Sequence, residues 1–235
     1  MPANPLAPAR SQRRHPKMLP DDARDRLAAA VTTARDRLVI SWLYDGGFRI
    51  GELCGLHLVD LHLRENASCA QARSAHVHIC HREANSNKAR AKSKYPWDAV
   101  DGVVRGGLIR RVSPAMVHAY FEYMTCEYPT AVATGHGMLL VQLAGADFGA
   151  PWTPDAARSM LRRAGRRAGL GKVKPHQFRH SFATAVLDAS DGNLLIARDA
   201  GGWASAATVG AVYGHTDIHD QSFNSALRKV WGEQP

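Results

Sequence analysis

The chain has 235 residues, with 30 Lys plus Arg against 21 Asp plus Glu and a formal net charge of +9. This length is sufficient for one large domain or two small ones with a hydrophobic core, and the positive charge favours a polyanionic partner. Four cysteines without a C-x-x-C pair indicate a reduced, intracellular and therefore cytoplasmic protein. No apolar run is long enough for a signal peptide or a membrane span, so we expect neither secretion nor membrane insertion.

The N-terminal third is predicted to be a basic arm followed by helices. Residues 1–18 are rich in Pro, Ala and Arg and read as a solvated arm. From Pro20 the pattern predicts an amphipathic helix that runs on through Val31 and Ala34. A mostly buried helix, "RDRLVISWLYDGG", should stop at Gly46 and Gly47, and Arg49 should open the next helix.

The middle of the chain predicts a small sheet between residues 76 and 112. "HVHICHRE" alternates, with Val77 and Ile79 on one face and histidines on the other, and "LIRRV" is a later strand. Ser113 and Thr153 are each followed by proline, which predicts an N-cap and first helical residue for two further helices. The expected fold is therefore mostly α with a small antiparallel β-sheet.

A basic run lies between Ala156 and Leu187, where no acidic residue occurs. An i, i+4 row of arginines without a carboxylate partner in the helix repels itself, so the run favours nucleic-acid contact over an ordinary solvated helix face. The predicted DNA-binding residues in it are Arg158, Arg162, Arg163, Arg166, Arg167, Lys172 and Lys174.

The stretch "KPHQFRHSFAT" combines a packing face with a polar stripe. Phe178, Phe182 and Val186 recur at four-residue spacing and should be buried, whereas the stripe beside them holds two histidines and an arginine. Taken alone, such histidines are usually structural and such an arginine usually reaches water.

Three stretches in order, "DGGFRIGELCGLHLVDL", "KPHQFRHSFAT" and "GGWASAATVGAVYGH", resemble the catalytic domain of the tyrosine recombinases, or phage integrase family. The family pattern has a "TGLRISEL" helix start, a hairpin lysine, an "H-x-L-R-H-S-F-A-T" helix, a "G-H" or "G-W" and a tyrosine nucleophile. The resemblance covers roughly residues 18 to 225, and ordered motifs are more specific than any one of them.

The resemblance implies a role for each matching residue. Arg49 and Arg179 would bind the scissile phosphate, Lys92 would be the general acid, and Tyr213 would be the nucleophile. The remaining implied roles fall to Glu52 as the acid supporting Arg49, to His176 as the base for the tyrosine or a hydrogen-bond donor to the phosphate, to Trp203 as a catalytic residue, and to His180 as a packing or supporting neighbour.

This sequence departs from the family pattern at three places. Trp203 lies ten residues before Tyr213 where nine are usual. "PWDAVDGVVRGG" extends the hairpin, so that Lys88 and Lys94 remain alternatives to Lys92. The family's additional N-terminal helical domain is not expected, because only the basic arm precedes the catalytic domain, which we assign to residues 19–235.

The predicted function is site-specific recombination of double-stranded DNA through a 3′-phosphotyrosyl intermediate, by a homo-oligomer of two to four copies. A non-catalytic DNA-binding remnant and a type IB topoisomerase are the alternatives. The chemistry needs no cofactor, and two arginines and a lysine can replace a metal. Several histidines and Cys80 could ligate a metal, but no known ligand spacing organises them, so no metal site is predicted.

Overall fold

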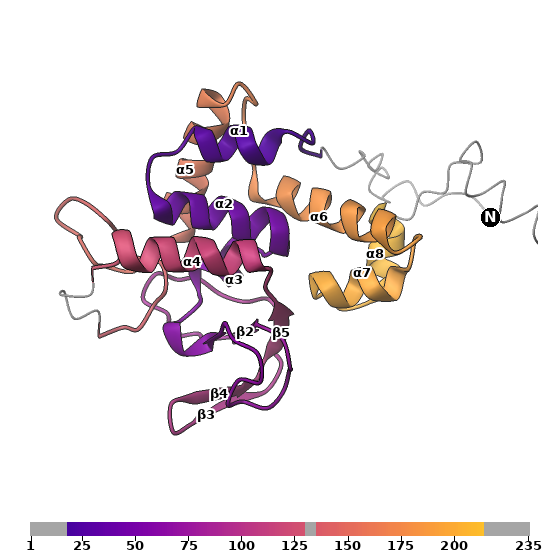
Figure 1. Ribbon diagram of the computed structural model, residues 1–235, viewed down its shortest axis with the longest axis horizontal. Helices are drawn as coiled ribbons and strands as arrows, with labels where there is room; N and C mark the ends of the chain where they lie inside the picture. Colours follow the sequence, from indigo (N-terminus) through magenta and orange to yellow (C-terminus); the bar gives the residue numbers. More distant parts are fainter. Residues whose placement is uncertain (1–17, 130–134, 214–235) are drawn as a thin grey trace, which may run out of the picture.

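The fold is mostly helical, with two small antiparallel sheets at one end (Figure 1). The computed structural model describes residues 18–129 and 135–213. The predicted arm, apart from its last residue, lies outside these ranges. The helices of the described ranges are α1 (Ala23–Ala29), α2 (Ala34–Gly46), α3 (Ile50–Cys54), the 3₁₀ turn η1 (Leu58–Asp60), α4 (Pro114–Cys126), α5 (Pro154–Arg167), α6 (Pro175–Ala189), α7 (Leu194–Gly201) and α8 (Ala206–Tyr213). None of them is long and apolar enough to cross a membrane.

Side-chain caps set the starts of three of these helices. The hydroxyl oxygens of Thr33, Ser113 and Thr153 accept hydrogen bonds from backbone amides in the first turns of α2, α4 and α5, at 3.1, 3.2 and 3.1 Å. Pro114 and Pro154 follow two of these caps, where their fixed φ suits the first helical position. The predicted starts of α4 and α5 are confirmed.

The single helix predicted from Pro20 through Ala34 is wrong, because the chain divides there into α1 and α2. α1 ends at Ala29, Val31 lies in the link, and Ala34 begins α2. The carboxylate of Glu127 accepts hydrogen bonds from the backbone N–H groups of Ala34 and Arg35 at 2.8 and 3.0 Å. Together with the Thr33 cap, this acid satisfies free amides of a new helix start, which outweighs the apolar periodicity.

α2 is the central helix of the main core. It packs against α4 and α6, and the indole of Trp42 donates a hydrogen bond to the carbonyl of Met116 at 2.9 Å. Leu38, Trp42 and Phe48 are fully buried. The helix stops at Gly46 with Gly47 in the left-handed conformation at φ 58°, as predicted.

The sheets follow α3 along the chain and lie below the helices in Figure 1. Strands β1 (Leu61–His62), β2 (His76–Ile79) and β5 (Leu108–Arg111) pair in the order β1-β2-β5. The extension of the hairpin forms its own two-stranded sheet from β3 (Trp97–Val100) and β4 (Val103–Gly106). The predicted strands at β2 and β5 are confirmed, and every residue of β2 is buried, so both of its faces are covered.

The last helices pack on a second, much smaller apolar cluster. Leu187, Ala197 and Val209 are its buried residues, with Trp203 and Tyr213 packed against it. α6 runs from the main core out to this cluster, so that α7 and α8 lie to one side of the body (Figure 1). The described part of α8 ends at Tyr213.

The buried face of α6 differs from the predicted one. Phe178 is fully buried, but Phe182 and Val186 are only half-buried, and Ala183 and Leu187 are buried in their place. A step of four residues turns about 40° beyond one helical turn, so a strict four-residue row drifts off the buried face.

Candidate active site

Arg49 stands at the N-terminus of α3, held by an acid one helical turn on. Glu52 accepts hydrogen bonds from the backbone N–H of Arg49 at 3.0 Å and from its guanidinium at 2.5 Å. The Glu52 side chain is fully buried, whereas that of Arg49 keeps 21% of its surface exposed. A charge-assisted pair of this kind orients the guanidinium while leaving N–H donors for an anion.

Arg179 projects from α6 into the same place and is only 4% exposed. Its Nη1 donates to the carbonyl of Gly47 at 2.8 Å, and its guanidinium carbon lies 3.8 Å from the ring centroid of Trp203. Burial and then the charge of Arg49 lower the pKa of Arg179 to about 9, so the side chain remains a cation at neutral pH. Its buried Nη2 has no hydrogen-bond partner among the described residues. A buried donor is costly to leave unpaired, which favours an acceptor oxygen at this position.

Arg110 on β5 is a third arginine of this centre, which the sequence analysis missed. It is 2% exposed, donates to the carbonyl of Gly201 at 2.7 Å and to that of Gly46, and stacks over the ring of Phe48. Burial lowers its pKa to about 10. The sequence contained a signal for this burial, because strand alternation places Arg110 on the same face as the apolar Leu108 and Val112.

The Tyr213 hydroxyl lies 2.5 Å from Nδ1 of His180. Burial raises the pKa of Tyr213, and the charges of Arg179 and Arg49 oppose this rise. Burial lowers the pKa of His180, and the neighbouring His176 and Arg179 lower it further. A neutral imidazole can accept the hydroxyl proton, so the local geometry makes His180 the base nearest to Tyr213.

His176 occupies the first turn of α6 and is the more exposed of the two histidines. Its ring centroid lies 6.4 Å from that of His180. Partial burial lowers the pKa of His176, and Arg179 and Lys92 are the next largest causes. The charge of Arg49 acts in the same direction, so a neutral His176 is favoured beside these cations.

Trp203 joins the arginine and the tyrosine despite its unusual spacing from Tyr213. Its ring centroid is 5.8 Å from that of Tyr213, and the other contact is the cation of Arg179. Gly202, at φ 64°, ends α7 in the left-handed conformation just before it. The additional residue between Trp203 and Tyr213 is therefore accommodated without separating the two rings.

Comparisons with known proteins point to one family. The family described as "Phage integrase family" matches residues 111–219. Tyrosine recombinase XerC of Pseudomonas aeruginosa is 29% identical over an alignment of 239 positions that covers 97% of this chain and 66% of that protein. Transposase A from transposon Tn554 of Staphylococcus aureus is 27% identical over 158 residues, 67% of this chain and 37% of the transposase.

Solved structures agree with this result. The crystal structure of XerA recombinase superposes with a TM-score of 0.60 at 26% identity, over 94% of this chain and 67% of that one. The Tn1549 transposon integrase, solved in complex with transposon right end DNA, gives a TM-score of 0.60 at 15% identity over 91% of this chain and 65% of the integrase. Residues 111–219 therefore match the phage integrase family, and the chain as a whole is similar to tyrosine recombinases.

This tyrosine recombinase homologue spans about two thirds of the length of XerC and just over a third of that of Tn554 transposase A. Its fold is that of the tyrosine recombinase catalytic domain. In this fold the start of α3, the N-terminal half of α6 and the end of α8 meet at the cluster of Arg49, Arg179 and Tyr213.

The three candidate lysines of the recombinase homologue are all exposed, but they lie in different surroundings. The charge of Lys92 acts on His176, which places this lysine beside the cluster. Lys88 lines a separate hollow with Gly51, and Lys94 lies 3.9 Å from the carboxylate of Glu83.

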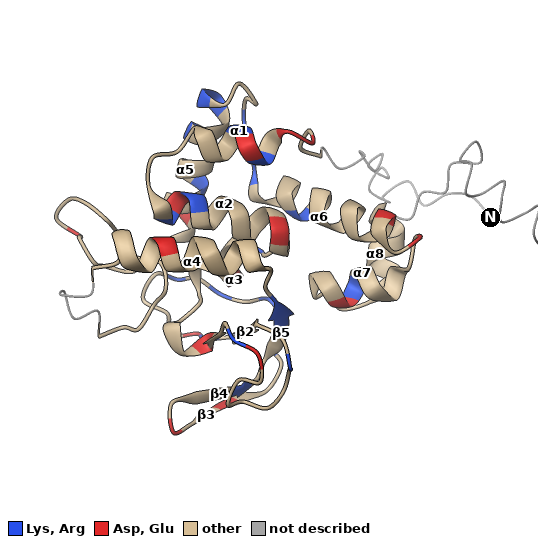
Figure 2. Ribbon diagram, viewed as in Figure 1, with Lys and Arg blue, Asp and Glu red and all other residues tan. Residues whose placement is uncertain are grey.

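The basic run of the recombinase homologue is carried by α5 and the link to α6. Lys and Arg gather on α5 in Figure 2, and this helix carries Arg162, Arg163, Arg166 and Arg167, all of them exposed. The expectation that Arg158 has no carboxylate partner within the helix is wrong, because its guanidinium lies 2.5 Å from the carboxylate of Asp155. The exposed arginines at the C-terminal half of α5 remain available to an anion.

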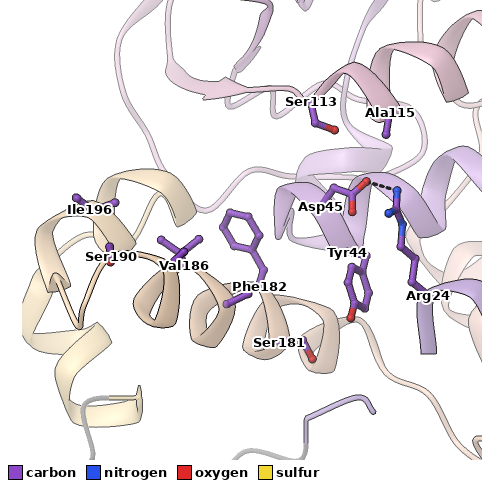
Figure 3. Close-up of a pocket in the computed structure, with 12 residues that line it drawn as sticks. Arg24, Tyr44, Asp45, Ser113, Ala115, Ser181, Phe182, Val186, Ser190 and Ile196 are labelled. Atoms are coloured by element: carbon purple, nitrogen blue, oxygen red, sulfur yellow. Dashed lines mark hydrogen bonds and ion pairs between the residues drawn. The ribbon is translucent and has the colours of Figure 1, made fainter. Parts of the chain in front are cut away.

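An apolar cavity of about 700 Å³ lies between α2, α4 and α6 (Figure 3). Phe182 and Val186 project toward it from α6, while the ion pair of Arg24 and Asp45 at 2.7 Å lies at its other side. This cavity explains why the two apolar residues are only half-buried. α6, which lines this cavity, also carries Arg179 and His180.

Proposed function

We propose that this chain performs site-specific recombination by cleaving and rejoining double-stranded DNA through a covalent bond to Tyr213. The observation that carries the proposal is the 2.5 Å contact between the Tyr213 hydroxyl and His180, beside the buried guanidinium of Arg179 and its unpaired Nη2. A nucleophile, its base and a double cationic site for a phosphate are the parts that transesterification at phosphorus needs. The likeness to XerC and to Tn554 transposase A supports the same reaction.

In the proposed reaction the Tyr213 oxygen attacks phosphorus and its proton passes to His180. The bond from phosphorus to the 5′ oxygen breaks, and Lys92 gives a proton to that oxygen. Arg49 and Arg179 hold the two non-bridging oxygens, where charge develops, because planar guanidinium forks match that geometry and stay charged. His176 donates a hydrogen bond to the phosphate. Trp203 contacts both Arg179 and Tyr213 and so fixes their relative position. The product is a 3′-phosphotyrosine, and the free 5′ hydroxyl of another strand reverses the step.

The supporting residues and the domain assignment belong to the same proposal. Glu52 orients Arg49. Arg110 holds the C-terminal ends of α2 and α7, at Gly46 and Gly201, beside the site. The basic face of α5, with Lys172 and Lys174, follows the DNA backbone. The catalytic domain comprises residues 19–235, and the protein acts in the cytoplasm, where DNA is accessible.

Strand exchange between two duplexes cuts four strands, and each chain supplies one Tyr213. We therefore propose that up to four copies assemble on paired DNA sites. The measurement is the mass of the protein–DNA complex formed with one and with two duplex sites.

The test of the reaction is a Tyr213→Phe variant on a nicked duplex that traps the covalent intermediate. The parent chain should give a protein–DNA adduct stable to denaturing detergent, and the variant should bind DNA and give none, because a phenyl ring has no oxygen to attack. An adduct in Tyr213→Phe would assign the nucleophile elsewhere. DNA binding without adduct in the parent would indicate a non-catalytic remnant, and relaxation of supercoils without junctions would indicate a topoisomerase.

A further inference from the structure

A second cluster of reactive side chains lies in the three-stranded sheet, apart from the arginine centre. His62, Cys69, His76 and His78 are all buried, and their potential ligand atoms lie within 4.8 Å of one another. The proposed recombination reaction uses none of them. The question is why three imidazoles and a thiol converge in the interior.

Strand pairing brings the three histidines together. His62 on β1 is directly opposite His76 on β2, and His78 lies two residues further along β2, on the same face. The ring centroid of His62 is 5.1 Å from that of His76 and 4.7 Å from that of His78. Cys69 comes from the loop between β1 and β2, and its Sγ lies 3.1 Å from Nε2 of His76.

The second nitrogen of two of these rings is held by a backbone carbonyl. Nδ1 of His76 lies 2.7 Å from the carbonyl oxygen of Ser74, and Nδ1 of His78 lies 2.7 Å from that of Gly106. A carbonyl acceptor puts the proton of a neutral ring on Nδ1, so that Nε2 keeps its lone pair. Metal-binding histidines are commonly oriented by a carbonyl or carboxylate in this way.

The hydrogen bonds of the cluster are incomplete without a further group. Nε2 of His62 and Nε2 of His78 are buried and have no partner among the described residues. Buried polar atoms in native proteins are rarely left without a partner, and two of them within one cluster call for a shared one. An electrophile at the centre would satisfy both nitrogens and the thiol together.

We propose that His62, Cys69, His76 and His78 bind one zinc ion. Zinc prefers four ligands in tetrahedral arrangement and takes imidazole nitrogen and thiolate sulfur, whereas magnesium and calcium prefer oxygen ligands. Bond lengths of about 2.0–2.3 Å place tetrahedral ligand atoms roughly 3.3–3.8 Å apart, so small side-chain rotations close the cluster around the ion. Binding replaces the thiol proton of Cys69, which is released to solvent.

Four protein ligands leave no coordination position for water or substrate, so the zinc is structural. It ties the loop between β1 and β2 to the strands on either side of it. β2 is also the partner of β5, where Val77 pairs with Arg110. The ion therefore stabilises the sheet that carries Arg110 at the centre of the molecule.

The spacing explains why the sequence analysis expected no metal. The ligands are spaced H-x₆-C-x₆-H-x-H, which contains none of the C-x-x-C or H-x₃₋₅-H pairs of familiar zinc sites. The possible metal ligands considered from the sequence were several histidines and Cys80, not Cys69. Cys80 also is buried, but Cys69 is the cysteine that the β1–β2 loop brings to the cluster.

The test is the zinc content of the full chain, purified without chelators and measured by plasma mass spectrometry. The parent should hold one zinc ion per chain, and Cys69→Ala and His78→Gln should each lose it. Cys126→Ala and His118→Gln are matched controls, because both residues are exposed and outside the cluster, and they should keep the ion. Parent protein that stays free of zinc after incubation with zinc and desalting overturns the proposal, as does zinc retained in both cluster variants.

Cobalt substitution tests the ligands even if a variant folds poorly. The parent chain loaded with Co²⁺ should show the intense visible bands of a tetrahedral site and a thiolate charge-transfer band. Cys69→Ser should lose the charge-transfer band, and a chelator should lower the melting temperature of the parent but not that of Cys69→Ala. Octahedral cobalt bands in the parent, or a charge-transfer band that survives Cys69→Ser, contradict the site. All of these readouts are independent of DNA cleavage.

Discussion

The two halves of the proposed active site differ in the number of buried apolar residues that support them. The arginine half belongs to the main core, where α2 ends at Gly46 and α3 begins after Arg49, beside fully buried Trp42 and Phe48. The tyrosine half belongs to α7, α8 and the end of α6, whose cluster has Leu187, Ala197 and Val209 as its buried residues. A small cluster buries little apolar surface, so the tyrosine half should open more easily than the arginine half.

Arginines also join the two halves. Arg110 donates to Gly46 in one half and to Gly201 in the other, and Arg179 on α6 reaches back to Gly47. The phosphate-binding charges are thus tied to backbone carbonyls at helix ends. Among the described residues, Tyr213 contacts the side chains of His180 and Trp203 and packs against the small apolar cluster. If Tyr213 is the nucleophile, as proposed, the arginine half should stay in place while the tyrosine half opens more readily.

The largest expected effect separates protonation of the leaving oxygen, assigned to Lys92, from binding of the phosphate oxygens, assigned to the arginines. Lys92→Ala should cleave ordinary DNA about 10²–10⁴-fold more slowly, the usual range for acid–base catalysis, because the 5′ alkoxide then leaves without a proton. A substrate with sulfur in place of the bridging 5′ oxygen should restore nearly the parent rate, since a thiolate leaves readily. The measurement is the single-turnover rate of adduct formation on both substrates.

Arg49→Ala is the control for this prediction. It acts on the non-bridging oxygens, so it should be slow on both substrates, by roughly 10²–10³-fold. Sulfur rescue of Lys88→Ala or Lys94→Ala in place of Lys92→Ala would move the general acid, and rescue of none of the three would remove the lysine from the mechanism.

The next prediction compares the stabilities of the two halves directly. Leu38→Ala in the main core should lower the free energy of unfolding by an amount near the upper end of the usual range of about 2–5 kcal/mol, whereas Leu187→Ala should lie near the lower end. Leu38 is fully buried, and Leu187 keeps 8% exposure in a cluster that can collapse around the gap. Urea denaturation measures both values. Equal losses would contradict the expected difference in packing between the two clusters.

DNA affinity should come mainly from the main body. Replacing Arg162 and Arg166 by Gln should flatten the dependence of log K on log salt concentration by about 0.9 for each phosphate that the variant no longer neutralises. Arg198→Gln on α7 is the matched control, because Arg198 is already paired with Asp199 at 2.6 Å and its replacement should leave the slope unchanged. An unchanged slope in the α5 variant would make its arginines an ordinary solvated face.

The smallest expected effect concerns pH and the tyrosine half. The pKa of His180 lies below its ordinary value of 6.5, so more than half of the imidazole is still neutral at pH 6.5. If neutral His180 accepts the tyrosine proton, adduct formation at pH 6.5 should keep more than half of its plateau rate and fall only at lower pH. The acid limb should disappear in His180→Gln and persist in His176→Gln. The reverse result would assign the base to His176.

The local starts and stops of the fold were predictable from the sequence. Ser113 and Thr153 before proline, and the glycine pair after α2, act through nearest-neighbour chemistry, so the end of α2 and the starts of α4 and α5 were placed correctly. Ordered motifs likewise identified Arg49, Arg179, Trp203 and Tyr213, which the fold gathers in one place. The boundary between α1 and α2 was placed too late in the sequence, because the start of α2 depends on Glu127, 93 residues from Ala34.

Only the tertiary structure decided which groups meet. The His180 contact with Tyr213 joins residues 33 positions apart, and the Arg110 bridge spans 64 and 91 positions, so no local pattern contains them. The cluster of His62, Cys69, His76 and His78 arises from strand pairing and a loop that folds back, not from a ligand spacing. Local propensities act along the chain, whereas charge burial and the sharing of hydrogen bonds depend on segments that become neighbours only on folding.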